Sequence, residues 1–254
     1  MEYANVIVER RGYAGILTIN HPPANAVNIA MLEDINKALN ELEEDKNVRV
    51  VIFTGSGEKA FCAGFDLTDA SRADLSLLAG QGTWTRIDRL SKPTIAAING
   101  FAFGGGCELA LACHFRIMSE NPKAQIGLTE LNLGIIPGWG GTVRMTKLLG
   151  RSKALDLILF SKKIGAAEAL EAGLINKSSP DVMKDALELA ERIAERPPVA
   201  VSCVLKAMDS LNYNGLNEGL KLERDGIKTV GRSADAREGF AAFFERRKPD
   251  FKGE

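Results

Sequence analysis

Short β-branched runs alternate with stretches of helical apolar spacing through the first part of the chain. Residues 6–8, 15–19, 48–54 and 94–98 are rich in Val, Ile and Thr and predict buried strands. Between residues 29 and 45 the apolar positions recur at helical spacing and predict an amphipathic helix; they are Ile29, Leu32, Ile35, Leu39 and Leu42. Strands that alternate with helices indicate crossover connections and a largely parallel sheet covered by helices.

The pattern changes after about Gly138, from where nearly the whole chain has helical spacing. Glycines and prolines interrupt these predicted helices, for example at Gly165 and Pro180. No long low-complexity linker separates the two parts, and the sequence shows no fixed-period repeat. We therefore predict the α/β fold class, with an α/β core over residues 1–195 and a helical carboxyl-terminal region over residues 196–254. A turn at residues 10–12 is expected to join the first two strands.

Composition narrows the functional classes. The 254 residues carry a formal net charge of −1, which argues against a dedicated nucleic-acid binder. No apolar run reaches membrane-spanning length, and the first residues lack the features of a secretion signal, so we expect a cytoplasmic protein without membrane contact. The chain has four cysteines without a C-x-x-C pair and only two histidines, which gives a metal site little support. We expect reduced, mostly buried thiols.

Candidate chemistry is concentrated at the triple glycine of residues 104–106. The apolar run at residues 109–112 predicts a buried helix that these glycines open. Because the first N–H groups of a helix have no partner within it, the Gly105 N–H is placed to bind an oxygen that becomes negative during a reaction. Glu108 lies in the same first turn, where the helix dipole favours its ionised form.

A second glycine-bearing segment, residues 63–67, follows a predicted strand. Taken alone it is best interpreted as a strand-to-helix loop; the functional interpretation is that the Phe65 N–H faces the Gly105 N–H and completes an oxyanion hole. Glu130 supplies a second carboxylate. Individually, Glu108 is explained as an acid that complements a helix N-terminus and Glu130 as a surface acid beside a Thr129 cap. As a pair they can provide a general base and a general acid.

Two further segments carry less specific signals. The turn at residues 137–142 is glycine-dense and opens another predicted helix; Trp139 within it is interpreted as a packing residue whose bulk limits a pocket. Residues 243–248 combine two phenylalanines with basic side chains. The simplest interpretation is a solvated helix end, and the second interpretation is a site for an anionic ligand that contains a base.

Taken in order and at their spacing, four motifs resemble the enoyl-CoA hydratase/isomerase (crotonase) superfamily: residues 63–67, residues 104–110, Glu130 and residues 137–142. The resemblance runs from residues 20–26 to residues 246–251 and is nearest to the two-glutamate hydratases. It implies a crotonase/ClpP-like spiral of β-β-α units. It also implies that residues 196–254 mediate oligomerisation, as a homotrimer or a dimer of trimers.

The resemblance implies an acyl-CoA thioester substrate and a role in fatty-acid metabolism. Phe65 and Gly105 correspond to the oxyanion N–H groups, Glu108 to the base that activates water for attack at C3, and Glu130 to the acid that protonates C2. No separate cofactor or metal is implied, since coenzyme A is part of the substrate. The positions that correspond to contacts with the substrate or its coenzyme A are Ala24, Ala63, Asp66, Leu67, Thr68, Gly138, Phe243 and Arg246, the last two reaching a neighbouring subunit's coenzyme A.

Three positions depart from the family pattern: His114 stands where many relatives carry an acid, Phe65 is larger than usual, and Thr68 replaces a lysine of some relatives. The main rival activity is a Δ3-Δ2-enoyl-CoA isomerase, which often retains only the acid at position 130, so Glu108 favours the hydratase. A decarboxylase, a hydrolase, a ring-cleaving enzyme, an RNA-binding member and a non-catalytic scaffold also stay open. We expect short to medium acyl chains, with selectivity set between residues 70 and 89, around Trp84, and at Trp139.

Overall fold

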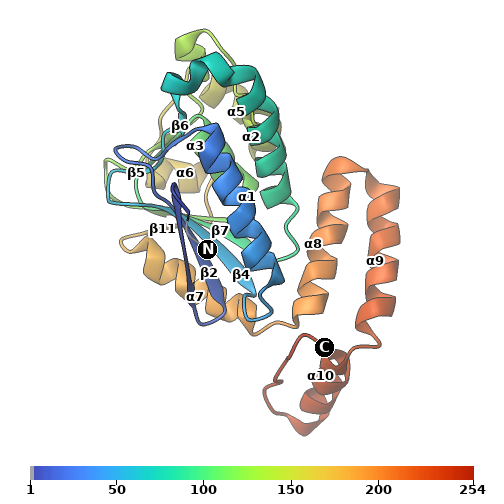
Figure 1. Ribbon diagram of the computed structural model, residues 1–254. Coiled ribbons are helices and arrows are strands. Elements are labelled where there is room, and N and C mark those ends of the chain that lie inside the picture. Colours follow the sequence, from blue (N-terminus) through green and yellow to red (C-terminus); the bar gives the residue numbers. More distant parts are fainter. Residues whose placement is uncertain (1–2) are drawn as a thin grey trace.

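The computed structural model describes residues 3–254 and has an α/β core from which the last helices project (Figure 1). The main sheet has six strands in the order β1-β2-β4-β7-β9-β11. The pair β1 and β2 is antiparallel, and the remaining pairs are parallel. These strands are β1 (Val6–Arg11), β2 (Ala14–Ile19), β4 (Val50–Gly55), β7 (Thr94–Ile98), β9 (Phe115–Ser119) and β11 (Lys177–Ser179).

Helices cover both faces of this sheet. On one face lie α1 (Ile29–Glu44), α2 (Ala73–Asp88) and α3 (Gly105–Ala112); on the other lies α7 (Val182–Ala194) (Figure 1). The helix α1 begins where the Asn28 side chain accepts a hydrogen bond from the Met31 N–H at 2.9 Å. Its apolar stripe is buried as the spacing predicts. Residues of alternating direction in the strands reach two separate cores, which accounts for their near-continuous hydrophobic composition.

Two small sheets lie beside the main one and hold the site segments. One has the order β10-β8-β5 and the other pairs β3 with β6 in parallel. Their strands are β3 (Ala26–Val27), β5 (Ala60–Cys62), β6 (Gly64–Phe65), β8 (Phe101–Phe103) and β10 (Ile126–Gly127). The chain thus repeatedly forms a strand of the main sheet, then a short strand of a small sheet, and then a helix. The predicted α/β fold class is confirmed by this arrangement.

Two sequence expectations need correction. The first strand continues to Arg11, so the turn to β2 lies at Gly12 and Tyr13 rather than at residues 10–12. The region after Gly138 also contains β11, which pairs in parallel with β9 at the edge of the main sheet. The three residues of β11 carry no apolar alternation, so no periodicity could show this strand.

The region after Gly138 is otherwise helical. It comprises α4 (Gly141–Leu149), α5 (Arg151–Leu159), α6 (Ala166–Ala172), α7, α8 (Pro198–Tyr213), α9 (Leu216–Val230) and α10 (Ala234–Glu245). The helices α8 and α9 pack against each other beside the core (Figure 1). Arg49 ties the projecting part to the sheet, because its guanidinium donates to the Ala194 carbonyl at 2.7 Å and the Phe251 carbonyl at 2.9 Å.

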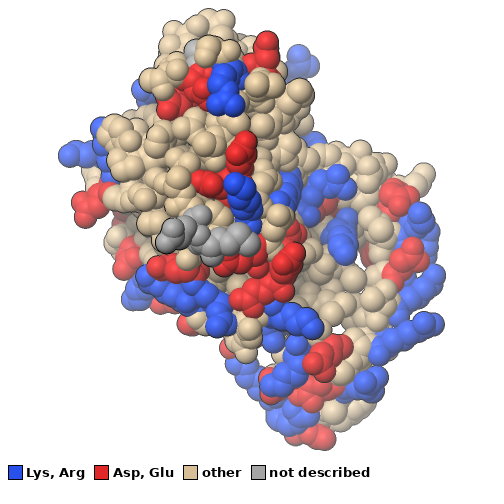
Figure 2. Space-filling model, in the orientation of Figure 1, with Lys and Arg blue, Asp and Glu red and all other residues tan. Residues whose placement is uncertain are grey.

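The surface carries both signs of charge. Figure 2 shows basic and acidic side chains intermixed over the face in view, including the carboxyl-terminal helices. Between residues 3 and 254 no helix is both long and apolar enough to cross a bilayer. Large apolar side chains nevertheless stand exposed on the last helices, among them Ile227, Phe240, Phe243 and Phe244.

Candidate active site

The backbone at Gly64, the first residue of β6, lies close against the backbone at the start of α3. An ideal Cβ atom on Gly64 would lie 2.7 Å from both the Gly105 amide nitrogen and the Phe103 carbonyl oxygen. Gly64 has a φ of +89°, in the region that favours glycine. The structure thus brings together the two segments that the sequence singled out. Phe65 and Gly105 both line one cavity, and their convergence on one oxygen stays a prediction.

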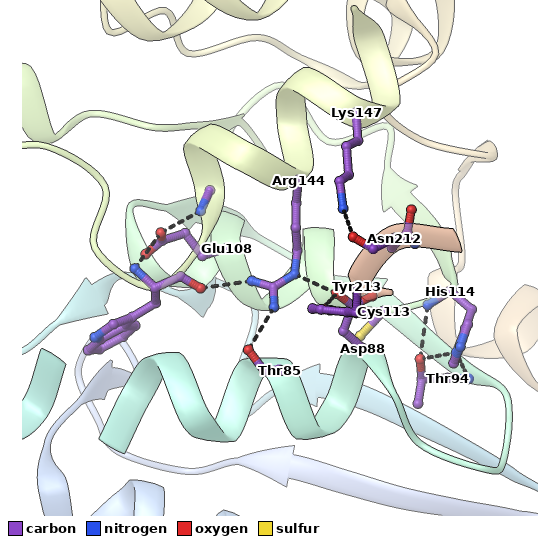
Figure 3. A network of polar contacts seen from close by, with 12 residues as sticks. Thr85, Asp88, Thr94, Glu108, Cys113, His114, Arg144, Lys147, Asn212 and Tyr213 are labelled. Carbon is purple, nitrogen blue, oxygen red and sulfur yellow. Dashed lines mark hydrogen bonds and ion pairs between the residues drawn. The ribbon is translucent and has the colours of Figure 1, made fainter. Parts of the chain in front are cut away.

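Glu108 is buried in the first turn of α3 and faces the loop before α4. Its Oε1 atom accepts a hydrogen bond from the Trp139 N–H at 2.8 Å and another from the Gly141 N–H at 2.7 Å (Figure 3). Both donors come from the glycine-dense turn at residues 137–142, so that turn orients the carboxyl group. An ideal Cβ atom on Gly141 would lie 2.8 Å from the Glu108 side chain, which explains why glycine stands there.

The helix dipole favours the ionised form of Glu108, but burial opposes it more strongly. The pKa of Glu108 is raised to about 7, chiefly by burial and also by the negative charge of Glu130. Hydrogen bonds from the Gly141 and Trp139 N–H groups and the charge of Arg144 lower the pKa of Glu108 without cancelling the cost of burial. The carboxyl group therefore titrates close to neutral pH, where a general base and acid are most effective.

Glu130 is buried and is not the surface acid that its sequence surroundings allowed. It opens the short 3-10 helix η2 (Glu130–Leu133), and Thr129 makes no side-chain cap. Its Oε1 atom lies against Gly104, where an ideal Cβ atom would come within 3.3 Å. Its Oε2 atom is buried without a hydrogen-bond partner among the described residues. Burial raises the pKa of Glu130.

A cavity of about 230 Å³ lies between these groups. It brings together seven of the predicted site residues, namely Ala63, Phe65, Leu67, Gly105, Glu108, Glu130 and Gly138. Sequence reasoning missed the apolar lining contributed by Leu133, Ile135 and Ile136, although apolar residues so soon after Glu130 were a usable signal. Residues of α2, Ala73, Ser76 and Leu77, complete the lining within the predicted selectivity segment.

The remaining predicted contacts lie outside this cavity. Ala24 is next to it, since its carbonyl accepts from the Ala63 N–H at 3.0 Å. Asp66 accepts from the Thr68 N–H at 2.9 Å and hydroxyl at 2.7 Å, which lowers the pKa of Asp66. Phe243 and Arg246 belong to the end of α10, where Phe243 lines a separate surface cavity. Within this chain they are not brought to Glu108.

Trp139 forms one wall of the cavity. An ideal Cβ atom on Gly80 of α2 would lie 2.3 Å from its indole ring, and one on Gly105 would lie 2.4 Å away. Its Nε1 donates to the Ser76 carbonyl at 3.1 Å. Trp84 packs edge-on against it at 5.6 Å between ring centroids but does not line the cavity. The indole is therefore clamped between two helices, as a packing residue that also limits the pocket.

His114, the clearest departure from the family pattern, lies at the start of β9 rather than in the cavity. Its Nδ1 accepts from the Thr94 N–H at 3.0 Å, and its backbone N–H donates to the Thr94 hydroxyl at 2.9 Å. Burial lowers the pKa of His114 to about 4, so the ring is neutral at physiological pH. These bonds make it a structural link between β7 and the end of α3.

Known proteins resemble this chain in sequence and in fold. The family model described as enoyl-CoA hydratase/isomerase matches residues 11–254. A probable enoyl-CoA hydratase of Bacillus subtilis (strain 168) is 43% identical over 251 residues, which are 95% of this chain and 96% of that protein. The short-chain-enoyl-CoA hydratase of Clostridium acetobutylicum is 38% identical over 98% of this chain and 97% of its own. The crystal structure of an enoyl-CoA hydratase from Bacillus anthracis has a TM-score of 0.93 at 39% identity and covers 99% of this chain and 100% of that one.

Proposed function

Because the chain belongs to the enoyl-CoA hydratase/isomerase family, we propose that it is an enoyl-CoA hydratase, a hydro-lyase that adds water to a trans-2-enoyl-CoA thioester. The reaction is a reversible syn addition that gives 3-hydroxyacyl-CoA. The observation that carries the proposal is the pair of buried carboxyl groups, Glu108 and Glu130, that line one cavity beside the N-terminus of α3. The resemblance to the crotonase superfamily seen in the sequence is confirmed by the family match.

The first role of the site is to hold the thioester oxygen. We assign this to the backbone N–H groups of Phe65 and Gly105, which lie on the two segments that Gly64 brings together. Attack on the enoyl group moves negative charge onto this oxygen, so donors already in place stabilise the enolate more than the ground state. Because α3 begins at Gly105, the helix dipole adds to this stabilisation.

Proton transfer is assigned to the two glutamates. The loop at residues 139–141 holds Oε1 of Glu108, which leaves Oε2 to take a proton from the water that attacks C3. Glu130, whose buried Oε2 has no partner among the described residues, delivers a proton to C2. Dehydration reverses these roles. The negative charge of Glu130 raises the pKa of Glu108, so ionisation of both carboxylates is disfavoured and we assign one shared proton to the pair.

We propose short acyl chains as the substrates. The cavity of about 230 Å³ is small, and Trp139 closes it between α2 and α3. The coenzyme A portion is assigned to the outer side of the site, at Ala24, Ala63, Asp66, Leu67, Thr68 and Gly138. The C. acetobutylicum relative, named a short-chain-enoyl-CoA hydratase, supports this choice.

We also propose that the protein forms a homotrimer or a dimer of trimers through residues 196–254. Exposed apolar side chains on the last helices, such as Phe243 and Phe244, support self-association. In that assembly Phe243 and Arg246 reach a neighbouring subunit's coenzyme A. Light scattering on the purified protein measures the mass directly, and a monomer at assay concentration contradicts this proposal.

Loss of the enoyl absorbance of crotonyl-CoA tests the hydratase proposal, with wild type, Glu108→Gln and Glu130→Gln compared. We expect turnover by the wild type and a loss of about two to four orders of magnitude in kcat for each variant. Glu58→Gln, a change at an exposed acid, is the matched control and is expected to keep activity. An inert wild type that isomerises a 3-enoyl-CoA instead contradicts the hydratase assignment and supports the isomerase.

A further inference from the structure

We propose that Arg144 is a positioning residue for Glu108 and that Tyr213 of the projecting helix α8 holds Arg144 in place through Asp88. The inference deepens the proposed function, because it takes Glu108 as the base. It assigns a role to side chains that touch neither the cavity nor, in the proposed mechanism, the substrate. It also connects the carboxyl-terminal helices to the site within one chain.

Arg144 lies on the first turns of α4 and is largely buried, with 11% of its side chain exposed. Its Nη1 donates to the Trp139 carbonyl at 2.8 Å, and its Nε donates to Asp88 Oδ2 at 2.9 Å (Figure 3). Its Nη2 donates to the Thr85 hydroxyl at 3.3 Å. The guanidinium thus bridges the loop before α4 and the last turn of α2, with its planar fork in a defined orientation.

Both backbone polar groups of Trp139 are hydrogen-bonded within this network. Its carbonyl accepts from Arg144, while its N–H donates to Glu108 Oε1. The next residue, Gly140, has a φ of +104°, and an ideal Cβ atom on it would lie 2.2 Å from the Arg144 Nη1. The Arg144 side chain therefore occupies the space beside the turn. Releasing it frees the Trp139 carbonyl and loosens the two N–H groups that orient Glu108.

The projecting helix completes this arrangement. Tyr213, the last residue of α8, donates its hydroxyl to Asp88 Oδ2, the same oxygen that accepts from Arg144 (Figure 3). A cavity of about 620 Å³ otherwise lies between α8 and this part of the core. The Arg89 guanidinium lies 5.1 Å from the centroid of the Tyr213 ring, and the Lys147 ammonium lies 5.4 Å from it. The hydrogen bond from Tyr213 is thus a specific contact between α8 and Asp88.

The positive charge of Arg144 also favours the ionised form of Glu108, in addition to the hydrogen bond through which it positions the Trp139 backbone. The groups that face Glu108 are the Trp139 and Gly141 N–H groups and Arg144, which lower its pKa, and Glu130, which raises it. The Cys107 thiol next to it is neutral, since burial raises its pKa well above the ordinary value. The charged or titratable groups around Asp88 are Arg144, Tyr213, Arg89, Asp209, His114, Cys113 and Arg116. Removing Arg144 therefore makes Glu108 harder to ionise.

The test compares kcat, KM and the pH profile of crotonyl-CoA hydration for wild type, Arg144→Met, Arg144→Lys and Tyr213→Phe. For Arg144→Met we expect kcat to fall about tenfold to a hundredfold with KM little changed, and the acid limb of kcat to move to higher pH. Tyr213→Phe is expected to shift both quantities in the same direction by less. Arg144→Lys keeps the positive charge but lacks the planar guanidinium. Compared with Arg144→Met, we therefore expect it to return the acid limb of kcat toward the wild-type pH more fully than it returns the value of kcat.

Lys147→Met is the matched control. Lys147 also joins α4 to α8, since its Nζ donates to the Asn212 carbonyl at 2.9 Å (Figure 3). Its ammonium approaches Tyr213 only over the ring, 5.4 Å from the centroid, and within residues 3–254 it hydrogen-bonds neither Trp139 nor Asp88 nor the Tyr213 hydroxyl. We expect its profile to match wild type. An equal loss in Lys147→Met, or a loss of kcat in Tyr213→Phe and Arg144→Met with an unmoved pH limb, would overturn the inference in favour of a general packing effect.

A readout without turnover separates this inference from the proposed function. The Glu108 carboxyl can be titrated by infrared difference spectroscopy of wild type against Glu108→Gln, with the same difference taken in the Tyr213→Phe background. A higher Glu108 pKa in the Tyr213→Phe background supports the coupling even in an enzyme that does not hydrate crotonyl-CoA. An unchanged pKa contradicts it even in an active hydratase.

Discussion

An ideal Cβ atom on Gly64 would lie 2.7 Å from the amide nitrogen of Gly105. Real Cβ atoms do not approach backbone so closely, so the two segments meet only because neither residue carries a side chain. This contact sets the separation between β6, which begins at Gly64, and the start of α3. The proposed oxyanion hole depends on this contact, because one donor is the N–H of Phe65, the residue after Gly64, and the other is the N–H of Gly105 itself.

Replacing Gly64 with alanine is therefore expected to damage catalysis. The added methyl group pushes the Gly105 N–H out of place, and loss of one oxyanion donor lowers kcat by about 10² to 10³. Gly57→Ala is the matched control, because Gly57 also has a positive φ, of +74°, but an added Cβ atom would meet nothing within 4 Å. Steady-state crotonyl-CoA hydration measures both. Equal losses in the two variants would point to backbone strain rather than to the oxyanion hole.

The pKa of Glu108 predicts an acid limb in the pH profile. As the proposed base for hydration Glu108 must be ionised, and burial raises its pKa to about 7. The kcat/KM for hydration is therefore expected to fall about tenfold per pH unit below that value. As the proposed acid Glu130 must be protonated. Its pKa is raised as well, and we expect activity to fall again on the alkaline side. Because the charge of Glu130 affects the titration of Glu108, we assign the two limbs to the pair rather than to either residue alone. A profile that stays flat from about pH 9 to about pH 5 contradicts this assignment.

Local pattern was enough to predict much of the fold. The spacing of Ile29, Leu32, Ile35, Leu39 and Leu42 predicted α1 nearly to its ends, and β7 has the predicted bounds. In α1 one face is buried, and in β7 the whole run is buried, so the apolar pattern matches the structure in both elements. The sequence could not show β11, because edge pairing with β9 rather than apolar patterning forms it. The same holds for the contact of Tyr213 with Asp88, which joins residues 125 positions apart.

The candidate site was predictable in its parts but not in its electrostatics. Glycines 104–106 and Glu108 indicated a helix N-terminus with a carboxylate, and the structure places them so. The sign of the Glu108 pKa shift could not be read from the helix alone. It depends on how completely the loop at residues 139–141 covers the carboxyl group, which is a tertiary property. For a buried carboxylate the cost of desolvation outweighs the dipole of a short helix.

Trp139 is expected to set the chain-length preference. Trp139→Ala opens the space between Gly80 and Gly105 but keeps the backbone N–H that binds Glu108. Each methylene that gains apolar contact contributes about 0.8 kcal/mol, a factor of about four. We therefore expect the ratio of kcat/KM for decenoyl-CoA to that for crotonyl-CoA to rise by about tenfold or more, consistent with a few added contacts.

The neighbouring Trp84 provides the control for this experiment. It packs against Trp139 and its Nε1 donates to the Gly105 carbonyl at 3.1 Å, but it does not line the cavity. Contrary to the sequence expectation for Trp84, we therefore expect Trp84→Phe to change stability and the rates for both substrates together, without changing the chain-length ratio. Trp139→Phe leaves part of the wall and is expected to give an intermediate ratio. Because a large-to-small change at a buried Trp costs about 3–5 kcal/mol, rates are compared well below the unfolding temperature of each variant. An unchanged ratio in Trp139→Ala rules out this residue as the limit on the acyl chain.

The raised pKa of Glu108 also predicts that this residue destabilises the folded protein at neutral to alkaline pH. Its folded pKa of about 7 exceeds the ordinary value of 4.5, so its contribution to stability is fully present below pH 4.5 and is lost as the pH rises through 7. The loss above pH 7 is about 3 kcal/mol, since each pKa unit corresponds to about 1.4 kcal/mol. Glu108→Gln keeps an oxygen for the Trp139 and Gly141 N–H groups but never ionises.

We expect the Tm of Glu108→Gln to exceed that of wild type at about pH 8, by about 2–4 °C for each kcal/mol, and the difference to vanish near pH 4.5. Thermal unfolding at one protein concentration measures this, with Glu58→Gln as the exposed control that is expected to match wild type. A lower Tm for Glu108→Gln at the alkaline pH would mean that the ionised carboxylate gains more from its two hydrogen bonds than burial costs it.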